Sequence, residues 1–427
     1  MTHDGRADLL EAFDPEMAAL TRQERERQIS TINLIASENF ASPYASCLEG
    51  SVWANKNGEG YPGKRFVAGC ELADRVEAIA IERAMRLFGC EHANVQAMSA
   101  TIGNVAILNA LLQPGDLILS MELTHGGHLS HGAKFHYSGK AFRAMHYGVD
   151  RATERIDIAQ VAALAREHRP KLIICGCSSY PRTIDYATFA AIAKSVDAIL
   201  LVDLAHNVGL VAAGAIPSPF PHADVVSTST HKTLRGPRGG GVILCKRAFA
   251  AAIDRALFPG LQGAPKLDMI AARAVLFREC MSPQFKRYGA QMVANAQALA
   301  DGCAEQGLRL VSGGTDTHLV LVEVTGVVPS GKQAESVLES VGLITNRNGI
   351  PFDAQPPNVA SGIRIGSPFM TTRGMKEADF QRVGALIGRV LHEHRDRVAL
   401  ESAAQELQAM ARGLPLFSPE WMPAASI

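Results

Sequence analysis

Short, continuously apolar runs alternate with helical periods between about residue 72 and residue 255, and this pattern constrains the fold more than any other feature of the chain. Continuous rather than alternating apolar runs are typical of strands that are buried on both faces of a sheet. The runs that predict strands are 93–97, 117–121, 171–175, 198–202, 223–226 and 241–245. The segments that predict helices are 72–88, 101–112, 158–168 and 186–195. The alternation predicts an α/β fold with a mainly parallel sheet, and such sheets bind ligands at the carboxyl ends of their strands.

The length of the chain predicts more than one domain. Its 427 residues exceed one ordinary hydrophobic core, so we expect two or three domains. Residues 265–306 predict two long helices, and from about residue 308 the pattern predicts a second, smaller set of strands and helices. We therefore divide the chain into an N-terminal segment, 1–70, a large domain, 71–285, and a small C-terminal α/β domain, 286–427.

The charge balance argues against a polyanionic partner. The chain carries 42 basic and 42 acidic residues, so its formal net charge is 0, and no long run of one sign occurs. We therefore expect neither nucleic acid nor a membrane as a partner. No apolar run approaches the roughly 20 residues of a membrane span, and the N-terminus lacks an apolar secretory segment. The eight cysteines are scattered without a Cys-x-x-Cys motif, which predicts reduced thiols in a cytoplasmic protein.

Small polar residues and histidines follow two of the predicted strands. Ser99, Ala100 and Thr101 open a helix, where backbone N–H groups bind phosphate, although a plain N-cap is the simpler interpretation. The segment 125–131 places three histidines at intervals of three, a spacing that could serve a metal. No carboxylate or cysteine lies close by in the sequence, so we expect no metal there. A flat imidazole that stacks on an aromatic ring is the alternative.

Three charged residues lie in or next to apolar strands, where a charge requires a buried partner. Asp203 ends the most apolar strand and either caps a helix or faces a protonated pyridine nitrogen. Lys232 follows the run 223–226 and is either a solvated charge or an amine held for Schiff-base chemistry. Arg364 either forms a structural ion pair or binds a carboxylate in bidentate fashion. A phosphate cradle, a flat stacking ring and these three charges together describe a pyridoxal 5′-phosphate (PLP) site for an amino acid.

From about residue 32 to residue 392 the chain resembles the serine hydroxymethyltransferases, also called glycine hydroxymethyltransferases. The motifs that carry the resemblance are Leu34-Ile35-Ala36-Ser37-Glu38-Asn39, Glu59-Gly60-Tyr61-Pro62-Gly63-Lys64-Arg65, His125-Gly126-Gly127-His128, Val202-Asp203-Leu204-Ala205-His206, Thr230-His231-Lys232-Thr233-Leu234, Gly236-Pro237-Arg238-Gly239-Gly240 and Gly362-Ile363-Arg364. The resemblance implies the aspartate-aminotransferase type of fold, fold type I of PLP enzymes, in a homodimer whose active sites are shared between subunits.

The resemblance also implies a role for each matching position. Lys232 carries PLP as a Schiff base, Asp203 faces the pyridine nitrogen and His128 stacks on the ring. Glu59, which the second subunit supplies, is the acid or base at the substrate hydroxyl. The implied cofactor-binding residues are Ser99, Ala100, Thr101, His128, Ser178, Asp203, His206, Ser229, His231, Lys232 and, from the second subunit, Gly263. The implied substrate-binding residues are Ser37, Glu59, Tyr61 and Arg364. If tetrahydrofolate is used, the residues that line its pocket are Leu123, Gly127, Leu129 and Asn348.

The chain departs from the family at three tyrosines. Asn57 stands where the family usually has tyrosine, and Phe66 and Val67 stand where it usually has two more. These changes remove hydroxyl groups near the phosphate, the lysine and the substrate, whereas the cofactor anchors are retained. The departures therefore bear on the substrate and on the use of folate rather than on the cofactor.

Three functions stay open on the sequence. The first is a folate-dependent hydroxymethyltransferase acting on serine or on a relative such as α-methylserine, which the retained Glu59 and folate-pocket residues favour. The second is a folate-independent threonine transaldolase or aldolase of specialised metabolism, which the altered tyrosines and the segment 370–377 favour. The third is a catalytically silent regulatory paralogue, against which the intact Lys232 and Asp203 argue.

Overall fold

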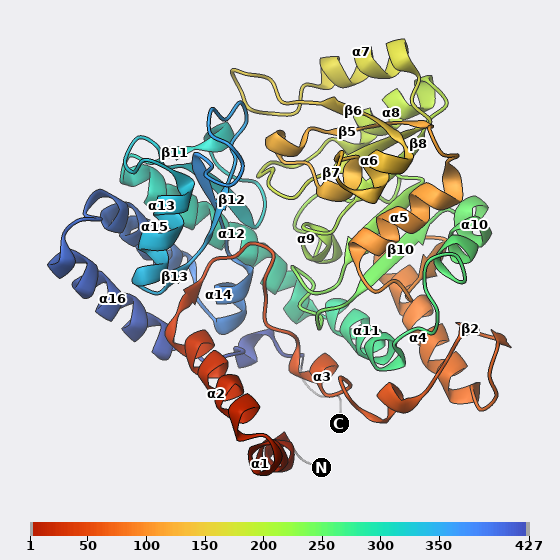
Figure 1. Cartoon of the computed structure of the whole chain (residues 1–427), viewed down its shortest axis with the longest axis horizontal. Helices are drawn as coiled ribbons and strands as arrows, with labels where there is room; N and C mark the ends of the chain where they lie inside the picture. Colours follow the sequence, from red (N-terminus) through yellow and green to blue (C-terminus); the bar gives the residue numbers. More distant parts are fainter. Residues whose placement is uncertain (1–2, 424–427) are drawn as a thin grey trace.

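The computed structural model describes residues 3–423, whose two larger sheets lie side by side, each with its own helices (Figure 1). The larger sheet has seven strands. In spatial order they are β4 (His92–Asn94), β10 (Gly241–Cys245), β9 (Val225–Ser229), β8 (Ile199–Asp203), β7 (Leu172–Gly176), β5 (Leu117–Met121) and β6 (Arg143–Tyr147). The pairs from β9 to β6 are parallel, and only β10 runs antiparallel to its neighbours β9 and β4. The predicted α/β fold with a mainly parallel sheet is thus confirmed.

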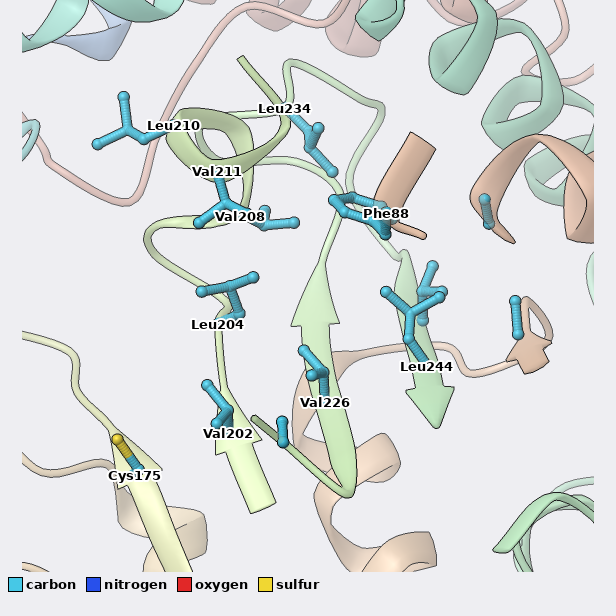
Figure 2. Close-up of a cluster of buried hydrophobic side chains, with 14 of the residues drawn as sticks. Phe88, Cys175, Val202, Leu204, Val208, Leu210, Val211, Val226, Leu234 and Leu244 are labelled. Atoms are coloured by element: carbon cyan, nitrogen blue, oxygen red, sulfur yellow. The ribbon is translucent and has the colours of Figure 1, made fainter. Parts of the chain in front are cut away.

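Both faces of the larger sheet are buried, which explains the continuous apolar runs of its strands. Neighbouring residues of a strand point to opposite faces. Val202 and Val226 pack with Phe88 in a core on one face (Figure 2), and Leu201 and Val225 pack in a separate core on the other. The helices of this part are α4 (Glu71–Phe88), α5 (Ala100–Leu111), α6 (Tyr137–Ala141), α7 (Ile158–His168), α8 (Tyr186–Ser195), α9 (Val208–Ala212), α10 (Arg247–Leu257) and α11 (Leu267–Cys280).

The smaller sheet is antiparallel and has a core of its own. Its strands in spatial order are β11 (Arg309–Leu310), β12 (Leu319–Glu323), β15 (Gly362–Gly366) and β14 (Asn346–Asn348). Its helices are α12 (Pro283–Glu305), α13 (Gly331–Ser340), α14 (Pro368–Arg373), α15 (Glu377–His392) and α16 (Arg397–Arg412). Helices α12 and α15 pack closely because glycines lie at their contact: a Cβ atom on Gly302 would lie 2.2 Å from the carbonyl oxygen of Gln381.

The N-terminal segment runs past both sheets (Figure 1). It begins with α1 (His3–Phe13) and α2 (Pro15–Ser30), and Asp14 caps α2 by accepting a hydrogen bond from the Met17 amide at 3.1 Å. Strand β1 (Ile32–Asn33) then pairs in parallel with β13 (Leu343–Ile344). After the short α3 (Pro43–Ser46), a hairpin of β2 (Gly60–Tyr61) and β3 (Lys64–Arg65) packs against α4.

Most predicted elements of the larger sheet lie where the sequence placed them. The predicted strands 117–121 and 241–245 coincide with β5 and β10. Strand β6 was not predicted, because Arg143–Tyr147 is an edge strand with polar residues among its apolar ones. The predicted strand 223–226 is shifted, since β9 continues through the buried hydroxyl residues Ser227, Thr228 and Ser229. The division of the chain at residues 70 and 285 stays a prediction.

The cysteines and the helices also bear on the expectations from the sequence. All eight cysteines are free thiols, and six of them are buried. Among the helices of residues 3–423, none has both the length and the apolar character that crossing a membrane requires.

Candidate active site

One pocket gathers nearly all of the predicted cofactor-binding residues. It is lined by Ser99, Ala100, Thr101, His128, Cys177, Ser178, Asp203, Ala205, His206, Ser229, His231 and Lys232. Strands β7, β8 and β9 are parallel neighbours, and each ends at this pocket, with Ser178 following β7 and with Asp203 and Ser229 ending β8 and β9. The parallel topology therefore brings together side chains from distant parts of the sequence. Of the predicted cofactor-binding residues, only Gly263 does not line this pocket.

The N-terminus of α5 forms one wall of the pocket. Ser99 is the N-cap, and its hydroxyl oxygen accepts a hydrogen bond from the Ile102 amide at 3.1 Å. The first amides of a helix have no intrahelical acceptors, so Ala100 and Thr101 present N–H groups suited to an anion. Strand β10 approaches this turn closely, because a Cβ atom on Gly241 would lie 2.4 Å from the carbonyl carbon of Ser99. The arrangement can hold a phosphate group.

Asp203 is a buried carboxylate with a full set of donors. Its Oδ2 accepts hydrogen bonds from His131 Nε2 at 2.9 Å and from Asn104 Nδ2 at 2.8 Å, and its Oδ1 accepts one from the Ala205 amide at 3.0 Å. Burial alone would raise the pKa of Asp203, but its hydrogen bonds, above all the one with His131, outweigh burial and hold the pKa below its usual range. The carboxylate therefore stays ionised and can face a cationic ring nitrogen.

Lys232 lies in the loop after β9 and lines the same pocket. Burial lowers the pKa of its ammonium group to about 8, with Arg364 and Arg238 adding to the effect and Asp203 opposing it. A lysine with a lowered pKa holds more of its amine in the unprotonated, nucleophilic form near neutral pH. The backbone of Lys232 is also anchored, because Asn39 Nδ2 donates to its carbonyl oxygen at 2.9 Å.

His128 presents a neutral ring to the pocket. Its Nδ1 accepts a hydrogen bond from the Ser130 amide at 3.2 Å and lies 2.7 Å from Ser130 Oγ. Burial lowers the pKa of His128 to about 4, so the imidazole is uncharged near neutral pH. His128, His131 and Asp203 have ligand atoms within 4.8 Å of one another and could hold a metal ion. Since His131 and Asp203 already bond to each other, the absence of a metal stays our prediction.

His206 pairs with a histidine that the sequence did not point to. His206 Nδ1 lies 3.3 Å from His318 Nε2, and the two rings stack with centroids 5.5 Å apart. Burial lowers the pKa of both groups, that of His318 to about 3. His318 comes just before β12, so the pair joins the pocket to the smaller sheet.

Arg364 reaches the pocket from strand β15. Its Nη1 donates to the Ser178 carbonyl oxygen at 2.7 Å, and its Nε donates to Asn346 Oδ1 at 3.2 Å. Burial lowers the pKa of Arg364 to about 10, and the guanidinium remains charged. The segment that carries Ser37 lies beside the same strand, because the Gly366 amide donates to the Leu34 carbonyl oxygen at 2.8 Å. Both predicted carboxylate-binding residues thus lie at one side of the site.

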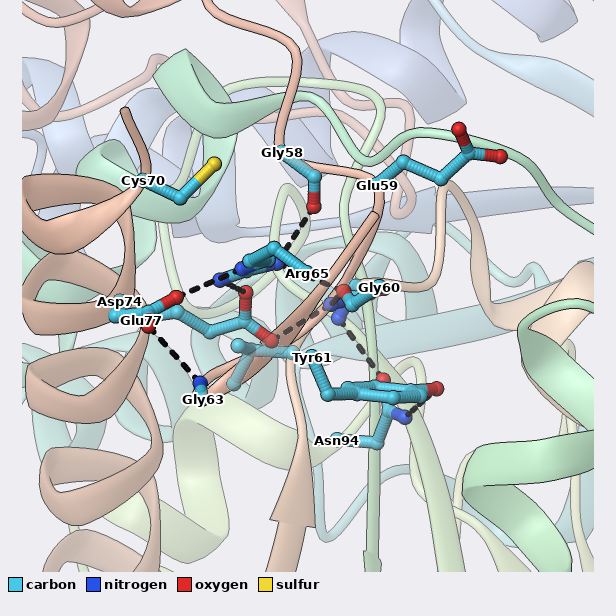
Figure 3. A network of polar contacts seen from close by, with 12 residues as sticks. Gly58, Glu59, Gly60, Tyr61, Gly63, Arg65, Cys70, Asp74, Glu77 and Asn94 are labelled. Atoms are coloured by element: carbon cyan, nitrogen blue, oxygen red, sulfur yellow. Dashed lines mark hydrogen bonds and ion pairs between the residues drawn. The ribbon is translucent and has the colours of Figure 1, made fainter. Parts of the chain in front are cut away.

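Two other predicted residues lie outside the pocket, on the hairpin of β2 and β3. The Tyr61 hydroxyl donates to the Asp254 carbonyl oxygen at 2.7 Å and accepts from Asn94 Nδ2 at 3.0 Å, so it anchors the hairpin to its own chain. The carboxylate of Glu59 points away from this polar network (Figure 3). Within residues 3–423 its side chain forms no hydrogen bond or ion pair. Gly263, the predicted cofactor-binding residue that does not line the pocket, lies in the loop after α10 and is exposed.

Three of the four residues predicted for folate lie on or between two short turns, and the fourth, Asn348, lies on a strand. Leu123 and Leu129 begin the turns η2 (Leu123–His125) and η3 (Leu129–His131), and they are 36% and 42% exposed. Gly127 is buried between them, and a Cβ atom there would lie 2.3 Å from the Met121 carbonyl oxygen. Asn348 ends β14, where its Nδ2 donates to the Gly349 carbonyl oxygen at 2.7 Å. The exposed leucines offer an apolar surface to a flat ligand.

The residues of the pocket fit PLP. A helix N-terminus suits its phosphate, an ionised Asp203 suits its protonated ring nitrogen, and Lys232 can bond to its aldehyde. The supporting residues Asn39, Asn104 and His318 had no predicted role, because they reach the site only through the fold. A signal existed for Asn39, which ends the motif that begins at Leu34, and for His131, the third histidine of the segment 125–131.

The chain is similar to known proteins over nearly its whole length. The family model described as "Serine hydroxymethyltransferase" matches residues 10–387. A serine hydroxymethyltransferase of Myxococcus xanthus is 51% identical over 409 residues, covering 96% of this chain and 98% of the relative. One of Synechococcus is 50% identical over 421 residues, covering 96% of this chain and 97% of the relative. One of Coprothermobacter proteolyticus is 56% identical over 374 residues, covering 88% of this chain and 90% of the relative.

Proposed function

Because the chain belongs to the serine hydroxymethyltransferase family, we propose that it interconverts serine and glycine, with tetrahydrofolate as the carrier of the one-carbon unit. The family consists of PLP-dependent enzymes of fold type I, and this chain is an enzyme of that class. The observation that best supports the proposal is the shared pocket of Lys232 and Asp203, with the N-terminus of α5 beside them.

Each residue of the pocket has a defined task under this proposal. Bound PLP supplies an electron sink for the charge that develops at the substrate Cα. Lys232 holds the cofactor covalently, and Asp203 keeps a proton on its ring nitrogen. Arg364 and Ser37 bind the carboxylate of the amino acid, and this orients the bonds at Cα relative to the ring. His128 packs on the ring as a neutral imidazole.

The proposal requires a second copy of the chain. The Glu59 side chain forms no hydrogen bond or ion pair within residues 3–423. Under the proposal it takes or returns the proton of the substrate hydroxyl in the second copy. Large apolar side chains are exposed around the hairpin and on α1, including Phe66 at 74%, Val52 at 77% and Phe13 at 88%. Such side chains favour a homodimer, in which each copy covers them for the other. A cytoplasmic location stays a prediction from the sequence.

The exposed leucines of η2 and η3 support the use of tetrahydrofolate. Leu123 and Leu129 are candidates for packing against the flat pterin ring, with Asn348 offering a polar side chain. We propose that these residues bind the folate while the aldehyde carbon is transferred. Replacement of serine by α-methylserine is compatible with the same residues.

A second candidate function has its own observation. Asn57, Phe66 and Val67 lack the hydroxyl groups that the family usually has, and all three lie on or next to the Glu59 hairpin. A threonine transaldolase, which transfers a glycyl unit between aldehydes without folate, fits this loss. A silent paralogue does not fit, because the charged residues of the pocket are complete.

One assay separates these functions. The purified enzyme, loaded with PLP, is given serine or α-methylserine with and without tetrahydrofolate, or threonine with and without a second aldehyde. Our proposal expects glycine from serine, at a rate that tetrahydrofolate raises. Acetaldehyde release from threonine that a second aldehyde accelerates, with no effect of folate on serine, would establish the transaldolase instead.

A further inference from the structure

A single arginine holds the backbone on both sides of Glu59. Arg65 Nη1 donates to the carbonyl oxygen of Gly58 at 2.6 Å and to that of Gly60 at 2.7 Å (Figure 3). These are the residues directly before and after Glu59. The backbone is therefore held at the peptide group that precedes Glu59 and at the one that follows Gly60, whereas the Glu59 carboxylate is left free.

The arginine is itself fixed to helix α4. Its Nε donates to Asp74 Oδ1 at 2.8 Å, and its Nη2 donates to Glu77 Oε2 at 2.7 Å. Only 4% of the Arg65 side chain and 1% of the Glu77 side chain are exposed. Gln96 Nε2 closes the network, because it donates both to Glu77 Oε1 at 2.7 Å and to the Gly60 carbonyl oxygen at 2.9 Å. Residues outside the hairpin thus hold both Arg65 and the Gly60 carbonyl group in place.

A buried ion pair of this kind is an inefficient way to stabilise a fold. Its desolvation offsets much of its attraction, and apolar residues of the same volume are often as stable. What an arginine adds is geometry, because its planar fork can hold several oxygens in fixed positions at once. The backbone it holds is also special: Gly60 has φ of 99°, and a Cβ atom there would lie 2.4 Å from the Lys64 carbonyl oxygen.

We propose that Arg65 is a positioning residue of the reaction, which sets the location of the Glu59 carboxylate through the carbonyl groups of Gly58 and Gly60. The proposal rests on the role given to Glu59 in the proposed function. It does not rest on cofactor binding, since Arg65 does not line the Lys232 pocket. We call the hydrogen bonds from Arg65 to the Gly58 and Gly60 carbonyl groups the backbone clamp. Loss of this clamp should slow the reaction at the substrate hydroxyl and leave the reaction at Cα nearly unchanged.

The test compares Arg65→Lys with a matched control, Arg373→Lys. Lysine keeps the charge but cannot reach two carbonyl groups and two carboxylates together. Arg373 is also buried and also donates to backbone carbonyl groups, but these are at residues 28–31 and 411–415, far along the chain from Glu59. Both variants are first checked for thermal unfolding and for the visible absorbance of bound PLP.

The first readout is independent of activity. Hydrogen–deuterium exchange of the amides in 57–66 should become faster in Arg65→Lys by roughly tenfold, as expected from the loss of charge-assisted hydrogen bonds. The same amides should be unchanged in Arg373→Lys. Unchanged exchange of 57–66 in Arg65→Lys would overturn the proposal.

The second readout compares two reactions of the dimeric holoenzyme, serine cleavage and the exchange of the glycine α-proton with solvent. Arg65→Lys should lower kcat for serine cleavage on the order of 100-fold, the effect of a misplaced catalytic group. It should leave KM and the exchange of the glycine α-proton with solvent nearly unchanged, and Glu59→Gln should show the same pattern. An equal loss of both reactions, or the same loss in Arg373→Lys, would mean a merely structural role and overturn the proposal.

Two further variants keep the outcomes distinct. If Arg65→Lys does not fold, Asp74→Asn decides, since it weakens one anchor of Arg65 and leaves the carbonyl contacts; it should give a smaller change of the same pattern. If Glu59→Gln cleaves serine normally, the proposed role of Glu59 is wrong, and the catalytic part of this inference is overturned with it. Faster exchange of 57–66 in Arg65→Lys would then still report the clamp itself.

Discussion

The Lys232 pocket and the Glu59 hairpin are both built on buried charges, but the charges are used in opposite ways. In the pocket, Lys232 and Asp203 point inward to a common space that parallel strands define. At the hairpin, Arg65 binds the backbone and is itself bound by Glu77 of α4, and the Glu59 side chain forms no hydrogen bond or ion pair within residues 3–423. Under the proposed function, the first region binds PLP with groups of one chain, apart from Gly263 of the second copy. The second region presents a carboxylate that acts in the other copy.

The largest effect should come from removing the amine of the pocket. Lys232→Ala should lose the visible absorbance of covalently bound PLP and lower serine cleavage on the order of 10⁴-fold or more, as the loss of a covalent catalyst does elsewhere. Absorbance spectra of the purified variant after dialysis check this prediction. Absorbance that persists would contradict the assignment of Lys232.

The next largest effect should come from the carboxylate. Asp203→Asn keeps the shape of the side chain but removes the charge that holds a proton on the ring nitrogen, so kcat should fall by roughly 10²–10³-fold. The backbone clamp at Glu59 should be unaffected. Steady-state kinetics together with PLP content test this, and a kcat within a few-fold of the wild type would show that the charge of Asp203 is not required.

A smaller effect concerns the pH at which the apoenzyme takes up PLP. Because burial lowers the pKa of Lys232 to about 8, about half of its amine is unprotonated at that pH, and nearly all of it is unprotonated about one pH unit higher. The rate of PLP uptake should therefore rise through pH 8 and level off about one unit above it. A rate that continues to rise toward the pKa of an ordinary lysine, about 10.4, would contradict the burial of this amine.

The smallest effect should come from the hairpin positions that differ from the family. The double change Asn57→Tyr and Val67→Tyr restores two hydroxyl groups on a surface that is exposed or half-buried, so its effect on unfolding should be within about 0.5 kcal/mol. Its effect on serine cleavage should be an increase of a few-fold at most. The ratio of serine to threonine cleavage measures this, and an unchanged ratio would show that these positions do not set the substrate.

The sequence predicted the pocket better than the hairpin for a physical reason. Strand-end residues such as Asp203 follow apolar runs, and parallel strands carry their ends to one edge, so their convergence can be predicted. Asn104 and His318 could not be predicted, because they reach the site through the packing of α5 and of the smaller sheet. In the hairpin, the sequence shows Arg65 but not that its side chain turns toward Gly58 and Gly60.

Edge strands and strand ends were also less predictable than buried strands. Strand β6 escaped prediction because an edge strand needs no continuous apolar run. Strand β9 continues beyond its apolar part since the buried hydroxyl of Ser229 donates to the Ala205 carbonyl oxygen at 3.1 Å. The acceptor of this buried hydroxyl lies just after the neighbouring strand β8, so the local sequence around Ser229 does not reveal it.

The most direct test of the account mixes two inactive variants. Lys232→Ala and Glu59→Gln subunits are unfolded together, refolded at equal amounts with PLP, and assayed for serine cleavage. If the Glu59 of one copy completes the Lys232 pocket of the other, each mixed dimer has one intact site, and about a quarter of the wild-type activity returns. If activity stays at the level of the separate variants, the hairpin and the pocket do not act across two copies, and the account is wrong.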